Sequence, residues 1–339
     1  MAELDHWHPV LRSEDLRDKP AAVRLAGQEI VVFRTPSGAL GALSDRCPHR
    51  GMRLSAGWVE GERLVCRYHG WRWAPDGRGE SPGTPTAKPC AVRFDVAERH
   101  GAVWVKRAGA EAAFPRIEAD GFFEVGRFRH RAKAPLELVL DNFTEIEHTP
   151  TTHALLGYPL ERMAEVETRT TVTEDAIRVY NVGPQRKLPA PLYAVYRIPR
   201  DAWFVDDWTT RFSPVHCIYN QYWVHPETRE PVGDALRVAV FFNPVGPAET
   251  EIVTLAYATM APWSRLGLGS LLLPLTRAFV DLEVRRDCAL LGQLADLRPS
   301  LQGNALGRFD KALVASRRRI ASIYRGRAEE PRPGDLSAP

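Results

Sequence analysis

The chain has 339 residues, of which 44% are hydrophobic and 26% charged, and its formal net charge is +3. This composition is typical of a globular protein, and the length allows two or three domains. The charge is too small to indicate binding to nucleic acid or to an anionic membrane. The basic run Arg317–Arg319 is better explained as a solvated helix face than as a binding patch.

The sequence shows no sign of export or membrane insertion. Its first residues lack a basic region followed by an apolar one, so we expect no signal peptide. The longest apolar run, Leu266–Leu275, is short and contains Pro274, so we expect no transmembrane segment. Five cysteines make no disulfide framework, and Cys90, Cys217 and Cys288 lie outside the motif described below. These features fit a cytoplasmic protein.

The first hundred residues contain short segments of apolar and β-branched residues. Turn-forming pairs such as Ser37-Gly38 and Asp76-Gly77 separate these segments. The pattern predicts a small all-β domain over residues 1–110, including an N-terminal extension. The predicted strands are Ala22–Leu25, Glu29–Arg34, Leu40–Leu43, Arg63–Cys66 and Ala102–Lys106.

Two cysteines and two histidines within this domain form two tight pairs. Cys47 and His49 are spaced C-x-H, and Cys66 and His69 are spaced C-x-x-H. In a Rieske [2Fe–2S] centre two cysteines hold one iron and two histidines hold the other, so each pair can give one ligand to each iron. Zinc is the alternative, but zinc sites usually pair cysteine with cysteine and histidine with histidine. The spacing therefore favours a Rieske cluster.

After residue 110 the pattern changes, and helices are predicted among the strands. Antiparallel strands that close over a long helix make an α+β domain, which we place at residues 111–325. Residues 326–339 are expected to form a flexible tail. The predicted helices are Glu137–Glu147, Leu275–Leu297 and Phe309–Tyr324, and the predicted strands are Thr168–Val172, Ile177–Val182, Thr209–Phe212, Cys217–Val224, Arg237–Phe242 and Ile252–Thr259.

A second group of candidate metal ligands begins with His148 and His153. On an ideal helix two residues five apart lie roughly 140° apart, so the two imidazoles would not share a face. Pro150 lies between them and is expected to break the helix and bring the second ring round. Taken alone, the pair also fits two ordinary surface or capping histidines.

Asp287 is the third candidate ligand of this group. It lies in the predicted long helix, where one carboxylate interrupts an apolar stripe. A carboxylate that faces a core is costly unless it is paired or bound to metal. With the two histidines it would form a 2-His-1-carboxylate triad, which leaves open positions on Fe(II) for O2. The residues of the stripe are Val280, Val284, Leu291 and Leu294.

Other roles for Asp287 and other third ligands stay open at this point. Asp287 is also within reach of a salt bridge to a basic residue such as Arg286 or Arg317. In that case Asp281 or Glu283 of the same predicted helix would replace it as the ligand.

The motifs C-P-H-R-G and C-R-Y-H-G-W, followed by N-x-x-E-x-x-H-x4-H and a late helical Asp, resemble those of Rieske non-haem iron oxygenase α subunits. The resemblance is to the group of vanillate demethylase, dicamba monooxygenase and the ketosteroid hydroxylases. It implies a helix-grip fold for the second domain, one [2Fe–2S] cluster and one mononuclear Fe(II). It also implies a homotrimer in which the cluster of one subunit abuts the iron of the next.

Glu145 departs from the pattern that the resemblance implies. Such proteins usually have Asp three residues before the first ligand His, where it links that His to a cluster His of the neighbouring subunit. A carboxylate there accepts a hydrogen bond from each imidazole and couples the two centres. Glu145 is one methylene longer, so Asp141 or Glu147 are alternatives for the link. A solvated helix carboxylate is the structural alternative.

The resemblance implies a terminal oxygenase that takes electrons from a separate ferredoxin or flavin reductase. No G-x-G-x-x-G follows a predicted strand, which agrees with nicotinamide and flavin chemistry on another protein. We expect arginines of the cluster loops to form a docking face for an acidic donor, unless they simply brace the loops. These arginines are Arg46, Arg50, Arg53, Arg67 and Arg72.

The expected reaction uses O2 to hydroxylate or oxidatively demethylate a hydrophobic, ring-containing small molecule. Aromatic residues in the middle of the chain fit a mostly apolar pocket, and they equally fit the core of a sheet. A Rieske-type electron carrier without oxygenase activity is the main rival function, and a zinc-stabilised binding module is the other. The aromatic residues are Tyr158, Tyr193, Tyr196, Trp203, Phe204, Trp208, Tyr222 and Trp223.

Overall fold

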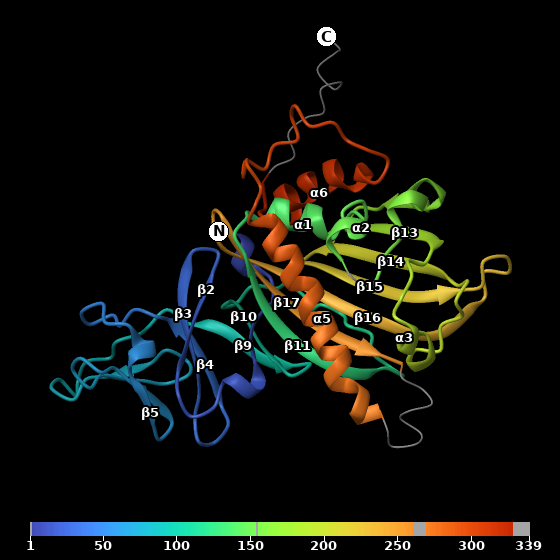
Figure 1. The fold of residues 1–339 in the computed structure, drawn as a ribbon. Helices are drawn as coiled ribbons and strands as arrows, with labels where there is room; N and C mark the ends of the chain where they lie inside the picture. Colours follow the sequence, from blue (N-terminus) through green and yellow to red (C-terminus); the bar gives the residue numbers. More distant parts are fainter. Residues whose placement is uncertain (1, 154, 260–268, 328–339) are drawn as a thin grey trace, which may run out of the picture. The chain divides into compact units, whose positions relative to one another are not determined.

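A computed structural model of the chain describes residues 2–153, 155–259 and 269–327 (Figure 1). The chain divides into two compact units. Unit 1 comprises Met1–Pro115 and Asn243–Pro247, and unit 2 comprises Arg116–Phe242 and Ala248–Pro339. No helix in the described ranges combines the length and apolar character needed to cross a membrane. The apolar run Leu266–Leu275 and the predicted tail 326–339 lie partly outside the described residues.

Unit 1 consists of short antiparallel strands in three small sheets. Three short 3-10 helices, η1 (Ala2–Asp5), η2 (Ser13–Asp15) and η3 (Leu54–Ala56), lie between them. The sheets have the strand orders β1 (His8–Arg12), β10 (Ala102–Arg107), β9 (Phe94–Arg99); β2 (Ala21–Leu25), β3 (Gln28–Arg34), β4 (Leu40–Ser44); and β5 (Trp58–Glu60), β6 (Arg63–Val65), β7 (Arg72–Trp73), β8 (Gly79–Glu80).

Strand β3 is apolar on both faces because it separates two cores. Its side chains alternate, as strand geometry requires. Ile30 and Val32 belong to one hydrophobic cluster, and Val31 and Phe33 belong to the other. The second cluster also contains Cys47 and Cys66, so it forms the apolar support on which both cysteine loops rest.

Unit 2 is built on a seven-stranded sheet with helices packed against it (Figure 1). The strand order is β11 (Phe123–Ala132), β17 (Glu249–Ala258), β16 (Pro231–Gly246), β15 (Val215–Val224), β14 (Trp203–Phe212), β13 (Ala176–Pro184), β12 (Glu167–Val172). The helices are α1 (Leu136–Phe143), α2 (Thr149–Thr152), α3 (Ala190–Val195), α5 (Gly269–Leu291) and α6 (Leu313–Arg319), with the 3-10 helices η4 (Leu160–Glu165) and η5 (Asp310–Ala312) and the π-helical turn η6 (Ile320–Tyr324).

The long helix α5 crosses the sheet and brings distant parts of the chain together. It packs against β11 and also contacts α1 and α2 (Figure 1). Val280, Val284 and Leu291 form its buried stripe. The predicted end of this helix is wrong, because α5 stops at Leu291 and Leu294 is 42% exposed beyond it.

The predicted fold class is confirmed: an all-β domain precedes an α+β domain in which a long helix packs on an antiparallel sheet. Every predicted strand overlaps an observed one, but the sequence did not indicate β1, β5, β7, β8, β9 or β11. Strand β11 lies at the edge of the large sheet and carries Arg127, Arg129 and Arg131, so its sequence lacks the apolar pattern of a buried strand.

Candidate metal sites

The first cysteine loop of unit 1 is closed by two backbone hydrogen bonds. The Cys47 N–H donates to the Met52 carbonyl over 2.8 Å, and the Gly51 N–H donates back to the Cys47 carbonyl over 2.9 Å. Gly51 has a φ of 74°, a left-handed conformation that costs glycine little. The loop therefore turns back sharply and presents Cys47 and His49 from one short segment.

The second loop has the same construction. The Cys66 N–H donates to the Trp71 carbonyl over 2.8 Å, and the Gly70 N–H donates to the Cys66 carbonyl over 3.0 Å. Gly70, at a φ of 68°, occupies the position equivalent to the glycine of the first loop. Two different ligand spacings, C-x-H and C-x-x-H, are thus held by one backbone arrangement.

The four side chains separate into a buried sulfur end and an exposed nitrogen end. Cys47 and Cys66 are 2% and 1% exposed, whereas both imidazoles are exposed. The rings of His49 and His69 lie 4.5 Å apart between centroids. Burial raises the pKa of the Cys47 thiol, so a thiolate at this position needs positive charge beside it. A diiron cluster with two sulfur and two nitrogen ligands fits this division.

The second candidate site is built on the short helix α2. His148 is the residue before its first turn, with φ −75° and ψ −22°, and His153 follows its last turn in an extended conformation. The expectation that Pro150 breaks a helix between the histidines is wrong. The predicted helix Glu137–Glu147 ends earlier, at Phe143, and Pro150 lies in the first turn of α2, where a missing N–H is tolerated. The two rings meet because they flank one short helix.

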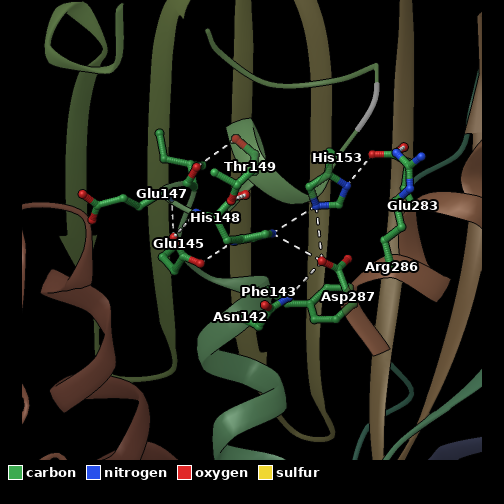
Figure 2. Close-up of polar contacts among 12 residues, drawn as sticks. Asn142, Phe143, Glu145, Glu147, His148, Thr149, His153, Glu283, Arg286 and Asp287 are labelled. Atoms are coloured by element: carbon green, nitrogen blue, oxygen red, sulfur yellow. Dashed lines mark hydrogen bonds and ion pairs between the residues drawn. The ribbon is translucent and has the colours of Figure 1, made fainter. Parts of the chain in front are cut away.

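His148, His153 and Asp287 bring three candidate ligand atoms into mutual contact (Figure 2). The two imidazole Nε2 atoms lie 3.0 Å apart, and Asp287 Oδ1 lies 3.3 Å and 3.2 Å from them. Neighbouring ligands around one octahedral ion with bonds of about 2.1 Å lie about 3 Å apart. All three separations match that spacing, so the atoms fit three adjacent positions of one ion.

Carboxylates behind the histidines fix the direction of both rings (Figure 2). The Nδ1–H of His148 donates to Glu145, and the Nδ1–H of His153 donates to Glu283. Each Nε2 is therefore turned toward Asp287. Such outer partners select the tautomer and raise the basicity of a metal-binding imidazole.

The charges of this group also fit a cation. Burial disfavours protonated imidazoles, but Asp287 and the outer carboxylates outweigh it and raise the pKa of His148 to about 9 and of His153 to about 10. Burial likewise opposes ionisation of Asp287, yet its hydrogen bonds to the two histidines lower its pKa. Without a metal, protons neutralise the cluster of carboxylates, and a divalent ion would replace them.

The salt bridges considered for Asp287 are not formed. Arg286 pairs with Glu283 at 3.3 Å, and Arg317 donates to Asp141 over 2.8 Å. Asp287 Oδ1 instead accepts a hydrogen bond of 3.1 Å from the side-chain amide of Asn142.

The two fallback ligands have other partners as well. Asp281 lies 2.9 Å from His130 and 2.7 Å from Arg285. Glu283 contacts His153 at Nδ1, the nitrogen that faces away from Asp287. Among the alternatives to Glu145, Asp141 is bound to Arg317, and Glu147 is exposed.

Sequence reasoning missed Arg186, which lies in the loop after β13 and donates hydrogen bonds to the backbone of α2. Its guanidinium donates to the carbonyls of His153, of Thr149 over 3.4 Å and of Pro150 over 3.3 Å. A cation at the carboxyl end of a helix satisfies its last carbonyls and its dipole. Arg186 lies 33 residues after His153, and no sequence signal links the two.

A cavity opens beside the triad and holds about 800 Å³ of atom-free space, including its mouth. Its walls come from α1, α2, α5 and strands β14 to β16, and they are mostly apolar. Of the eight aromatic residues singled out above, Phe204 and Trp208 line this cavity. Tyr196 and Trp223 line a second, apolar cavity that shares Leu156 and other residues with the first.

Comparison with known proteins gives the same assignment for unit 1. Residues 6–106 match the Rieske [2Fe-2S] domain. The vanillate O-demethylase oxygenase subunit of Pseudomonas sp. (strain HR199 / DSM 7063) is 31% identical over 156 residues, 44% of either chain. The 3-chlorobenzoate-3,4-dioxygenase oxygenase subunit of Comamonas testosteroni is 38% identical over 126 residues, 34% of this chain and 29% of that protein. The matched segments thus cover less than half of these relatives.

The fold comparison extends over nearly the whole chain. Dicamba monooxygenase bound to 3,6 dichlorosalicylic acid superposes with a TM-score of 0.82, covering 95% of this chain and 98% of that one at 18% identity. The chain thus contains a Rieske [2Fe-2S] domain, and its overall fold is that of dicamba monooxygenase. The predicted resemblance and the predicted [2Fe–2S] cluster are confirmed, and the zinc alternative for the cysteine loops is wrong.

Proposed function

We propose that the chain is the terminal oxygenase of a Rieske non-haem iron system. Cys47, His49, Cys66 and His69 would hold the [2Fe–2S] cluster, and His148, His153 and Asp287 would hold one Fe(II). The observation that carries the proposal is the contact of two Nε2 atoms and one carboxylate oxygen, at 3.0 to 3.3 Å, on the wall of an apolar cavity. An electron carrier would have no need of such a site.

When bound, the cluster would supply electrons one at a time and the ferrous ion would activate O2 for insertion into a substrate. The protein holds the Nδ1 protons of His148 and His153 on Glu145 and Glu283, so both Nε2 lone pairs stay directed at one point. Asn142 holds the Asp287 carboxylate through a single oxygen. The apolar cavity walls exclude water and position a hydrophobic ring.

The substrate class follows from the cavity and from the relatives. The vanillate and 3-chlorobenzoate enzymes are named for ring compounds, and the walls of this cavity are largely apolar. Hydroxylation or oxidative demethylation of a hydrophobic, ring-containing small molecule is therefore the proposed reaction. We place it in the cytoplasm, where a reducing environment preserves thiolate ligands.

Electrons would come from a separate ferredoxin or flavin reductase that docks near the cysteine loops. All five arginines named for this face are exposed. Arg53 and Arg72 pair with Glu29 and Glu60 at 3.0 Å and 3.1 Å, which supports the bracing role for these two. Arg67 also donates to the Ala56 carbonyl over 2.9 Å, which supports bracing for it as well. Arg46 and Arg50 would then attract the donor. Turnover with the donor should fall as ionic strength rises, and a flat salt response would remove the docking face from the proposal.

A homotrimer would bring the cluster of one subunit to the triad of the next, with Glu145 between them. Glu145 accepts from His148 Nδ1–H and from the His148 backbone N–H, the latter over 3.2 Å. Each carboxylate oxygen has two lone pairs, so the same group can accept a further imidazole N–H. Native mass spectrometry measures the number of subunits in the assembly, and a mass other than that of three chains would contradict the trimer. Glu145→Gln should slow electron transfer between the centres. It should also weaken Fe(II) binding about 10- to 100-fold, because Glu145 orients His148, so the transfer rate is measured on iron-loaded protein.

Iron analysis and product analysis test the proposed function. The oxygenase is expected to contain about three irons per chain, to show the spectrum of a mixed-ligand cluster and to form oxygenated product under air. The rival electron carrier would contain about two irons and form no product. A substrate screen with a generic reductase pair, read by mass, identifies the reaction. Peroxide formed without product would indicate that the screen lacks the true substrate.

A further inference from the structure

A row of polar side chains crosses the apolar sheet face that lines the triad cavity. The strand registers pair Asn181 of β13 with Asp206 of β14, and Asp206 with Gln221 of β15. Asp206 and Gln221 both line the cavity. The next lining residues along β14 on either side, Phe204 and Trp208, are aromatic. The row is therefore a local interruption of an apolar wall.

Asp206 is a buried carboxylate with no basic partner in the part of the chain that the structure describes. It is 7% exposed, and among the described residues its side chain accepts one hydrogen bond, of 3.2 Å, from the Gln221 amide. The neighbouring Asp207 points to the opposite face and pairs with Arg178 at 2.6 Å. Burial raises the pKa of Asp206 to about 7. A buried carboxylate that is retained without a cation is costly unless a ligand compensates for it.

The charges around the cavity single out this carboxylate. Four carboxylates line the cavity, and no Lys or Arg lies among its described lining residues. A bound Fe(II) would offset Glu145 and Asp287, and Arg286 pairs with Glu283. Of the four carboxylates, Asp206 is then the one whose negative charge no described lining group offsets. A substrate anion would meet like charge here, whereas a hydrogen-bond donor or a cation would be stabilised.

We propose that Asp206, oriented by Gln221, is a specificity-determining residue that binds the N–H group of an amine on a ring-containing substrate and disfavours ring carboxylates. This inference rests on the proposed function, because it takes the cavity to be the substrate site. The ring would lie against the apolar walls. The adjoining apolar cavity, which shares Leu156, Leu236 and Phe279 with the first, gives room for a second ring.

Binding to the iron-loaded full chain tests the proposal without turnover. Anaerobic calorimetry at about pH 8 compares 2-naphthylmethylamine with 2-naphthoate, which share a ring system and differ in charge. We expect the wild type to bind the amine at least about 10-fold more tightly. Asp206→Asn, which keeps the size of the side chain, should reduce the difference to less than about threefold. The matched control is Asp207→Asn on the other face of the strand, which should keep the wild-type preference.

Two results would overturn the inference. One is a wild type that binds the amine no more tightly than the acid, including the case in which neither binds. The other is a folded Asp206→Asn variant that retains the amine preference. The wild-type comparison stands even if that variant does not fold. Failure of the proposed function is separate, because it would show as two irons per chain while the amine preference persisted.

Discussion

Asp287→Asn is expected to remove the mononuclear iron and leave the cluster intact. Asp287 Oδ1 lies 3.3 Å and 3.2 Å from the Nε2 atoms of His148 and His153, and it is the anionic member of the set. Asparagine has the same size but offers a neutral oxygen. Loss of an outer carboxylate partner alone typically weakens metal binding 10- to 100-fold. Loss of the anionic ligand should therefore weaken it at least about 100-fold, or about 2.7 kcal/mol.

The assay is iron per chain together with the visible and paramagnetic spectra. Wild type should contain about three irons and the variant about two, with an unchanged cluster spectrum, because Cys47 and Cys66 belong to the other unit. Asp281→Asn is the matched control: it changes the same helix, but Asp281 binds His130 and Arg285. A variant at Asp287 that keeps three irons, or a control that loses one, would refute the assignment of the third ligand.

Three further predictions concern Glu283, Arg186 and His8. Glu283→Gln should weaken Fe(II) binding about 10- to 100-fold in an anaerobic titration, because it removes the anionic partner of His153 Nδ1. An unchanged affinity for Fe(II) would contradict the role of Glu283 in orienting His153. Arg186→Met should lower the free energy of unfolding, measured in urea, by about 1–3 kcal/mol and should weaken Fe(II) binding, because the carbonyls at the end of α2 lose their donor. The control Arg162→Met, which removes an exposed ion pair with Glu165, should change neither quantity. Burial lowers the pKa of His8 to about 4, so between pH 6.5 and 4 the unfolded chain binds a proton at this residue and the folded chain does not. The free energy of unfolding should therefore fall as the pH falls through this range. His8→Gln should make that fall less steep, and an equal slope in both proteins would contradict the prediction.

The cluster loops could be predicted from the sequence because their chemistry is local. Each loop supplies one sulfur and one nitrogen within four residues, as Cys47 with His49 and Cys66 with His69. The hydrogen bonds that close each loop also join near neighbours, such as Gly51 and Cys47. Composition and spacing therefore carried nearly all of the information that this part of the fold uses.

The triad was only half determined by the sequence. His148 and His153 are close in the chain, but α5 contributes residues more than a hundred positions away. Asp287 and Glu283 lie four apart on that helix, so both side chains share one face. The apolar stripe favoured Asp287 as the ligand but did not exclude Glu283. The packing of α5 decided which carboxylate is the candidate ligand, because it places Asp287 at the Nε2 atoms and Glu283 at the Nδ1 atom of His153.

What the sequence determined by itself is the chemistry that short segments carry: the ligand types, the alternation of the strands and the apolar stripe of the long helix. What only the tertiary structure decided is which side chains share a cavity. Alternation places Asp206 and Asp207 on opposite faces, but it does not say which face meets α5 and which meets Arg178. The physical reason is that strand register and helix packing are long-range contacts, fixed by burial of the whole core rather than by any one segment.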